Sequence, residues 1–361
     1  MKYKIWFASD HSMSGRKKRM LFDVCKDYEA IYRAGEKELS ALPFLNQKEI
    51  ATFLENKKSF PLDETMAYLT KNHIHVVTCR EKEYPKNLLT IPDYPFQLFY
   101  KGHLPGEHER LIAVVGARKC TGYGRNATAM LCETLSRQGY GIISGLADGI
   151  DGVAHASALS QKGASYGVLG CGVDICYPPK NQRLYEQLPV NGGVLSEYPC
   201  GTAPQPEFFP IRNRIISGMS DVVLVMEARE KSGSLITARW ALEQGRDVYA
   251  LPGRIFDQTS DGCHRIISEG AGIIVSVTGL LKDLKEIKNW DYQPIVSAAP
   301  SKIRLEKEET LVYSCLDFIA KSVDELSEES GLSVTELVPI LLHLCDLKLA
   351  EESFIHEYSK I

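Results

Sequence analysis

The feature that most constrains this chain is a unit that repeats between residues 106 and 290: a short apolar run, a glycine-bearing loop, and a segment with apolar residues at helical spacing. In the first copy, Leu111–Val115 is wholly apolar, Gly116 ends the run, and Arg125–Arg137 has the helical pattern. A strand without polar residues is typical of a parallel sheet that is covered on both faces. Strands that alternate with helices imply right-handed crossovers, so the pattern predicts an α/β fold with a doubly wound, mostly parallel sheet.

The loops that follow the expected strands carry the polar residues. We expect strands at residues 111–115, 140–144, 165–169, 194–199, 221–226, 247–251 and 272–277. Glycine, serine, lysine and arginine are frequent in the loops after them, at residues 116–119, 144–149, 170–181, 227–234 and 251–254. Ligands of such sheets bind beyond the carboxyl ends of the strands. Several anion-binding turns along one edge suit an extended polyanion better than a single phosphate.

Arg118 and Lys119 lie in the loop after the first strand. Backbone N–H groups at the start of the next helix attract an anion, and the two cations add charge-assisted contacts to phosphate. An ordinary turn with two solvated cations fits the same residues equally well. The loop matches neither G-x-G-x-x-G nor G-x-x-x-x-G-K-[ST], so it does not indicate a dinucleotide site or a Walker-type site.

Other polar residues near strand ends also have two interpretations. Ser232 and Ser234, together with Lys231, either hold an anion or form a plain helix cap. Asp151 and His155 form either an acid–base pair or, as we favour, a helix-start carboxylate with a packed histidine behind it. The sequence contains no convincing Ser/His/Asp or Cys/His arrangement, so we assign no catalytic residue.

The N-terminal segment, residues 1–75, has apolar residues at helix-like intervals and predicts a small helical domain. Ser12 or Ser14 is expected to cap the helix that carries the basic cluster Arg16–Arg19. This cluster either touches phosphate or, as we favour, forms a solvated helix face.

Two segments are expected to join domains. Residues 76–105 contain prolines that forbid a long helix and form a connector, in which the alternation within Phe96–Tyr100 predicts an edge strand. Residues 289–305 contain prolines and serines and predict a linker. The α/β domain is therefore expected to span residues 106–288.

Charge is distributed unevenly along the chain. The net charge is −4 overall, +3 over residues 1–75, +2 over residues 76–305 and −9 over residues 306–361. The acidic C-terminal segment supplies the negative excess, so the overall charge does not exclude a basic patch in the middle of the chain.

Composition narrows the class of protein. The N-terminus lacks the apolar region of a signal peptide, and no apolar run is long enough to span a membrane, so we expect a cytoplasmic protein. The ten cysteines are scattered without a C-x-x-C pair, which favours reduced thiols over a zinc site or any other metal site.

Several motifs occur together and in order. They are EYPKNLLTIPDYPFQLFYKG, VVGARKCTGYG, SGLADGIDGVAH, GVLGCGVDICYPPKN, FFPIRNRIISG, VMEAREKSGSLITARWALEQGRDVYALPG and DGCHRIISEGA. As a set, spanning residues 80–280, they resemble the DNA-processing protein A family. Cys120 stands where a more polar residue is expected, a mild departure.

The resemblance implies a fold and a function. The fold is a Rossmann-like domain with a small helical N-terminal domain, of SAM or helix-hairpin-helix type, and a winged-helix-like C-terminal domain. The function is binding of single-stranded DNA without a cofactor, as a homodimer through the Rossmann-like domain, with delivery of the DNA to the RecA recombinase in natural transformation.

The residues expected to bind DNA come from two arguments. By motif position, the resemblance implies a groove lined by Arg118, Lys119, Ser144, Gly145, Lys180, Arg212, Asn213 and Arg214. The anion-binding interpretation of the loop at residues 227–234 adds Lys231, Ser232 and Ser234.

Two alternatives to a single-strand DNA-binding protein stay open. A nucleotide phosphoribohydrolase of the lysine-decarboxylase-like group shares the sheet type, but its P-G-G-x-G-T-x-x-E motif is absent, and the nearest stretch is Leu251–Arg254. A regulator that binds DNA through residues 306–361 is disfavoured, because the second helix of that segment, Val334–Leu347, has acidic residues and no Arg, Lys, Asn or Gln. We expect the C-terminal domain to have a structural or protein-contact role.

Overall fold

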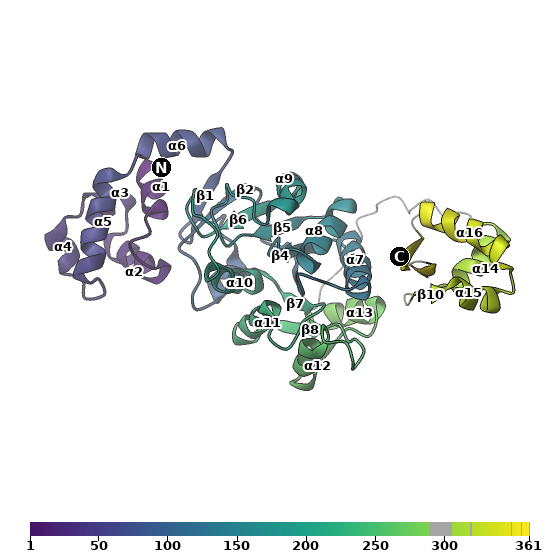
Figure 1. The fold of residues 1–361 in the computed structure, drawn as a ribbon. Coiled ribbons are helices and arrows are strands. Elements are labelled where there is room, and N and C mark those ends of the chain that lie inside the picture. Colours follow the sequence, from purple (N-terminus) through teal and green to yellow (C-terminus); the bar gives the residue numbers. More distant parts are fainter. Residues whose placement is uncertain (289–304, 318–319, 348, 355, 361) are drawn as a thin grey trace. The chain divides into compact units, whose positions relative to one another are not determined.

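The computed structural model describes residues 1–288, 305–317, 320–347, 349–354 and 356–360 (Figure 1). The chain divides into two compact units, and each is described on its own. One contains the N-terminal helices and the large sheet, and the other contains the C-terminal segment. Apart from residue 305, the expected linker lies outside the described residues.

The N-terminal segment is helical, as expected. Its helices are α1 (Lys2–Ser9), α2 (Gly15–Cys25), α3 (Tyr28–Arg33), α4 (Glu36–Ser40), α5 (Gln47–Ser59) and α6 (Leu62–Lys71). Ser14 caps α2 by accepting a hydrogen bond from the Lys17 N–H, which confirms the predicted start of this helix. Trp6, Phe7 and Phe53 are buried between the helices and are the aromatic part of this small core, together with Phe96.

A nine-stranded sheet follows, in the order β1-β2-β6-β5-β4-β3-β7-β8-β9. Its strands are β1 (His75–Thr78), β2 (Gln97–Gly102), β3 (Leu111–Val115), β4 (Gly141–Ser144), β5 (Ser165–Val168), β6 (Gly193–Ser196), β7 (Val222–Val225), β8 (Asp247–Ala250) and β9 (Gly272–Ile273). The strands from β6 to β9 are parallel, and β1 and β2 add antiparallel pairs. The prediction of a mostly parallel, doubly wound sheet is confirmed.

The expectation of an edge strand at Phe96–Tyr100 is wrong. β2 lies between β1 and β6, and β1 forms the edge. Leu98 and Phe99 are both buried, in different apolar clusters, so β2 is covered on both faces. The alternation within Phe96–Tyr100 therefore does not mark the edge of the sheet here.

Helices cover both faces of the sheet (Figure 1). They are α7 (Gly122–Arg137), α8 (Ile150–Ser160), α9 (Gln182–Asn191), α10 (Phe208–Met219), α11 (Gly233–Glu243), α12 (Asp261–Ser268) and α13 (Val277–Lys288), with short 3-10 turns η1 (Lys86–Thr90) and η2 (Pro179–Asn181). Ile215, Ile216 and Leu235 attach α10 and α11 to one face, and Leu188 attaches α9 to the other. This double cover explains why the central strands β3 and β7 are wholly apolar.

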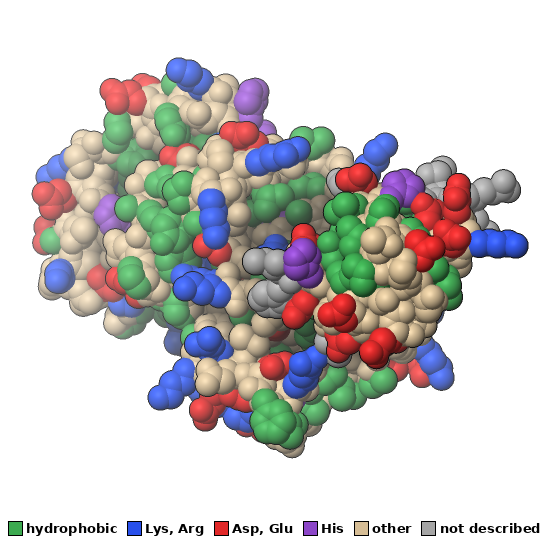
Figure 2. All heavy atoms as spheres, turned by 45° about the vertical axis from the view of Figure 1, so that its right-hand side comes forward, with side chains coloured by type: hydrophobic (Ala, Val, Ile, Leu, Met, Phe, Trp, Pro, Cys, Tyr) green, Lys and Arg blue, Asp and Glu red, His purple; other side chains and the backbone are tan. Residues whose placement is uncertain are grey.

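The C-terminal unit has the expected winged-helix arrangement. It contains α14 (Lys307–Cys315), β10 (Lys321–Ser322), α15 (Val323–Ser330), α16 (Val334–Asp346), β11 (Ala350–Phe354) and β12 (Glu357–Lys360). Gly331 ends α15 with a φ of +71°, which confirms the predicted turn between the two helices. Its core includes the fully buried side chains of Leu326, Leu337 and Leu341. Acidic side chains gather on this unit (Figure 2), in keeping with its net charge of −9 over residues 306–361.

The described residues contain neither a membrane-spanning helix nor a cluster of metal-binding side chains. Within these residues, no helix combines the length and apolarity needed to cross a bilayer. The same part of the chain contains no cluster of three or more His, Cys, Asp or Glu side chains that is suited to a metal ion.

Candidate nucleic-acid interface

The order of the strands creates a crevice beside β3. From β3 the chain builds β4, β5 and β6 on one side, then returns to place β7 on the other side. Loops that leave β3 and β7 therefore diverge, and ligands of doubly wound sheets bind at this switch point. A cleft of about 440 Å³ lies here. Its lining includes Gly116, Arg118, Ala147, Asp151, Tyr177, Phe209, Arg212, Asn213, Ser232, Gly233 and Ser234.

The first two loops of this edge are fastened to one another. The Ile150 N–H donates to the Ala117 carbonyl at 3.2 Å. Gly149 has a φ of +75°, and a Cβ on it would lie 2.2 Å from the Ala117 carbonyl oxygen. Only glycine permits both the backbone angle and the close approach. The loop that carries Arg118 is therefore held in place by the loop that follows β4.

The floor of the cleft contains a buried arginine. Arg212 is 4 % exposed, and its guanidinium donates to the Gly145 carbonyl at 2.9 Å and to the Val168 carbonyl. The buried Asp151 carboxylate accepts from the N–H groups of Gly145 and Ala147 at 3.1 and 3.3 Å. Burial lowers the pKa of Arg212 to about 10, so it stays charged near neutral pH. The floor of the cleft thus holds a buried guanidinium beside a buried carboxyl group.

An aromatic pair lines the cleft beside Arg118. The ring centroids of Tyr177 and Phe209 are 5.4 Å apart, and the Arg118 guanidinium lies 5.9 Å from the centroid of Phe209. Tyr177 is 39 % exposed. Neither ring is among the candidates from sequence. The available signal was an aromatic residue within a glycine- and proline-rich loop at a strand end.

The start of α11 forms the opposite wall. Ser232 caps this helix by accepting from the Ser234 N–H at 3.4 Å, so the interpretation as a helix cap is confirmed. The two hydroxyl groups are 2.7 Å apart, and the side-chain amide of Asn213 donates to the Gly233 carbonyl at 3.4 Å. The cap does not exclude an anion, because the lining of the cleft includes all three residues of the turn, 232–234.

The remaining lysine candidates lie on exposed loops at the same edge. Lys119 follows β3 and Lys231 follows β7, and both are exposed. The side chain of Lys180 is 65 % exposed, and its ammonium lies 2.8 Å from the Asp148 carboxylate. Like Lys119 and Lys231, it is not part of the cleft lining.

Two candidates lie away from the surface. Ser144 is fully buried, and its hydroxyl donates to the Val114 carbonyl at 2.6 Å. Arg214 is 5 % exposed, and both terminal nitrogens of its guanidinium donate to the Glu197 carboxylate. These groups are used within the fold, so the expectation that Ser144 and Arg214 face a DNA groove does not match their positions.

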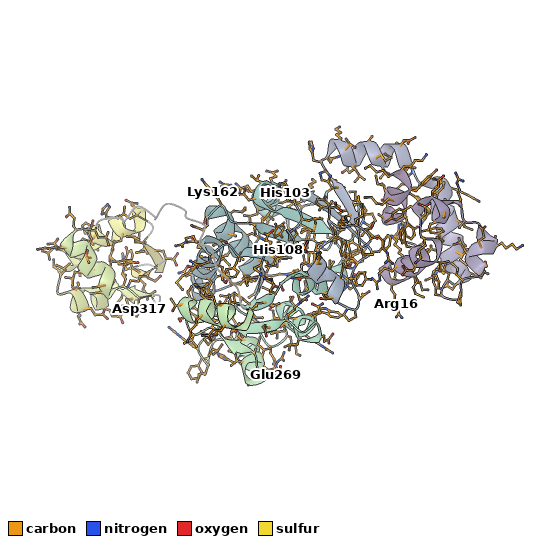
Figure 3. All side chains as sticks on the ribbon, turned by 180° about the vertical axis from the view of Figure 1, so that it is seen from behind. Arg16, His103, His108, Lys162, Glu269 and Asp317 are labelled. Carbon is orange, nitrogen blue, oxygen red and sulfur yellow. The ribbon has the colours of Figure 1, made fainter. Side chains whose placement is uncertain are left out.

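The structure also decides the interpretations of His155 and of the basic cluster Arg16–Arg19. His155 is buried, its Nδ1 lies 2.8 Å from the Ser165 hydroxyl, and burial lowers its pKa to about 3, so the packed histidine is confirmed. The basic cluster on α2 is not a solvated face as a whole. Arg16 is exposed at the surface of the N-terminal helices (Figure 3), but Lys18 and Arg19 are buried.

Comparisons with known protein families agree with these features. A family model described as DNA recombination-mediator protein A matches residues 75–285, and one described as a DprA winged helix domain matches residues 296–344.

Known relatives match much of the chain. A protein named Smf from Escherichia coli is 39% identical over 296 residues, which are 79% of this chain and 78% of that protein. A DNA processing protein DprA from Bacillus subtilis is 41% identical over 232 residues, which are 64% of this chain and 78% of that protein.

Two solved structures are similar as well. The X-ray structure of DNA processing protein A from Streptococcus pneumoniae has a TM-score of 0.68 at 34% identity, over 78% of this chain and 98% of that one. A structure described as giving insight into the single-stranded DNA binding mode of DNA processing protein A from Helicobacter pylori has a TM-score of 0.54 at 28% identity, over 60% of this chain and 97% of that one.

Proposed function

Because this chain belongs to the DNA recombination-mediator protein A family, we propose that it binds single-stranded DNA along the carboxyl edge of its sheet. The observation that carries the proposal is the cleft itself, where the Arg118 cation lies over the Phe209 ring, beside the exposed Tyr177 ring and opposite the start of α11. Single strands present both phosphates and unpaired bases, and proteins bind them with cationic grooves and stacking platforms. The similarity to the Helicobacter pylori protein supports the same function.

We assign the DNA contacts by exposure and by the lining of the cleft. Arg118, Lys119, Lys180 and Lys231 are exposed cations suited to phosphates. Asn213, Ser232 and Ser234 form the polar wall of the cleft, while Gly145 and Arg212 shape its floor. The rings of Tyr177 and Phe209 are the platform for bases. Ser144 and Arg214 are left out because they are buried and engaged within the fold.

The wider role follows from the family. We propose that the chain acts as a homodimer through its α/β unit and passes the bound strand to the RecA recombinase during natural transformation. We favour this role over a phosphoribohydrolase because the acid–base candidates Asp151 and His155 are buried and hydrogen-bonded within the fold.

A titration tests the proposal. A fluorescent oligothymidylate, the matching duplex and an assay for base release from nucleoside monophosphates are run with the same protein. We expect tight binding of the single strand and no base release. Arg118→Ala should weaken single-strand binding by about 1–3 kcal/mol, the range for a charge-assisted contact. Lys162→Gln is the matched control, because Lys162 (Figure 3) is exposed and precedes β5, at the amino edge of the sheet.

The dependence on salt tests the phosphate contacts separately. The logarithm of affinity should fall linearly with the logarithm of salt concentration, with a slope of about −0.7 per phosphate neutralised. Arg118→Ala should make that slope shallower by about 0.7, the contribution of one phosphate contact. Wild-type binding that is insensitive to salt would refute the phosphate assignments, and release of free base would favour the enzyme.

A further inference from the structure

The N-terminal helices contain two buried cations that the proposed DNA site does not use. Lys18 is 1 % exposed and Arg19 is 8 % exposed, and both lie on α2. Burial of a charge is unfavourable unless the charge is paired or hydrogen-bonded. The groups that hydrogen-bond to Lys18 and Arg19 therefore identify the segments of the chain that α2 holds in place.

Arg19 contacts the connector that leads into β2. Its guanidinium donates to the Tyr94 carbonyl and lies 4.0 Å from the centroid of the Tyr94 ring. The Arg80 guanidinium donates in turn to the Arg19 carbonyl at 3.4 Å. Arg19 thus fixes both the backbone and the side chain of Tyr94, the residue after Asp93.

Lys18 contacts the first residue of β2. Its ammonium donates to the Ala8 carbonyl at 3.1 Å and to the side-chain oxygen of Gln97 at 3.3 Å. The side-chain nitrogen of Gln97 donates to the Glu197 carbonyl at 2.9 Å. Lys18 is therefore joined through one amide side chain to the loop after β6.

Both paths end on the same arginine of α10. The Arg214 guanidinium holds the Glu197 carboxylate with N–O distances of 2.6 and 2.8 Å, and its Nε donates to the Asp93 carbonyl at 2.9 Å. Arg214 directly follows Asn213 and lies two residues after Arg212. One side of α10 is thus anchored to segments that α2 holds, and the other side supplies the cleft.

We infer that the N-terminal helical domain positions α10, through Lys18 and Arg19, and thereby sets the affinity of the cleft for single-stranded DNA. A helix moves as a rigid rod, so a shift at Arg214 displaces Phe209, Arg212 and Asn213 together. Lys18 and Arg19 are positioning residues that act without touching the strand. This inference rests on the proposed function and adds a role for a domain outside the matched region, residues 75–285.

The test compares Arg19→Met with Arg118→Ala in the full-length protein. Arg19→Met should weaken oligothymidylate binding by about three- to tenfold, the range that loss of one or two hydrogen bonds produces. Its salt slope should equal that of the wild type, because Arg19 contacts no phosphate. Arg33→Met is the matched control, because Arg33 is an exposed arginine of the same domain that pairs with Glu29, and it should bind as the wild type does.

Two further variants keep the test decisive. Lys18→Met retains the length of the side chain and should weaken oligothymidylate binding in the same way. It replaces Arg19→Met in the test if urea unfolding shows that Arg19→Met is not folded. Arg19→Lys should restore part of the affinity. The double variant Arg19→Met/Arg214→Lys should lose less binding free energy than the sum of the losses of the two single variants, because both residues act on one path.

The outcomes separate this inference from the proposed function. Loss of binding in Arg118→Ala with unchanged binding in folded Arg19→Met and Lys18→Met would overturn the positioning role alone. A shallower salt slope in Arg19→Met would also overturn it, because Arg19 would then contact phosphate directly. If the wild-type protein does not bind single-stranded DNA, the proposed function itself is refuted.

Discussion

Gly145→Ala should damage both stability and DNA binding, because Gly145 leaves no space for a methyl group. A Cβ at this position would lie 2.6 Å from a terminal nitrogen of Arg212 and 2.8 Å from a carboxylate oxygen of Asp151. Both groups are buried and hydrogen-bonded to the backbone around Gly145. The neighbours must therefore move at the expense of those hydrogen bonds.

The size of the effect follows from the contacts. Overpacking of a well-packed site costs about 1–3 kcal/mol, so the free energy of unfolding should fall by about that amount. Displacement of Arg212 also moves the floor of the cleft, so single-strand affinity should fall by about tenfold, the equivalent of one displaced contact. Gly145→Ala should therefore lower both the free energy of unfolding and the affinity for single-stranded DNA, whereas Arg118→Ala should lower the affinity alone.

The assay pairs urea unfolding with titration of a fluorescent oligothymidylate. Gly152→Ala is the matched control on the neighbouring helix α8, because the nearest atom to its added Cβ is the Ala147 carbonyl oxygen at 3.5 Å, an ordinary contact. Alanine within a helix should stabilise that variant by about 0.5–1 kcal/mol and leave binding unchanged. Equal stability and affinity of Gly145→Ala and the wild type would refute the role given to Arg212 and Asp151.

Three further predictions concern charge. Burial lowers the pKa of Lys18 from 10.5 to about 8 despite the attraction of Asp10 and Glu197. Between pH 8 and pH 10.5 the unfolded chain therefore binds more protons at this residue than the folded chain does. The unfolding free energy of the wild type should therefore rise relative to Lys18→Met by about 3 kcal/mol from pH 8 to 10.5, and a flat difference in urea unfolding would contradict the burial. Asp148→Asn should release Lys180 and tighten single-strand binding by about two- to fivefold, whereas weaker binding in the same titration would argue against a phosphate contact for Lys180. Deletion of residues 306–361, with their net charge of −9, should leave oligothymidylate affinity unchanged or slightly higher, and a tenfold loss in a folded truncation would place that domain in the DNA site.

Many strands, helix caps and turns of the chain were predictable from sequence because their signals are local. The apolar run at Leu111–Val115, the cap at Ser232 and the turn at Gly331 each depend on a few neighbouring residues, and the structure contains all three. The edge that carries the ligand loops was predictable for a similar reason, because strand direction in a parallel sheet decides which loops share an edge.

The composition of the site was only partly predictable. Arg118, Arg212, Asn213, Ser232 and Ser234 meet in one cleft, in agreement with the loop pattern and the family resemblance taken together. Tyr177 lies in the loop after β5 and Phe209 lies in the first turn of α10, and no local pattern indicates that their rings meet.

The sequence by itself determined where strands, caps and turns form, because those depend on side-chain periodicity and backbone preference over a few residues. Only the tertiary structure decided which charges are exposed. Arg118 and Arg214 look alike as residues of basic loops or helices, yet Arg214 is buried because Glu197 and the distant Asp93 surround it. Lys18 is buried because Gln97, far along the chain, accepts its hydrogen bond. Burial of a charge depends on partners that the fold brings together, and such partners leave no trace in the local pattern.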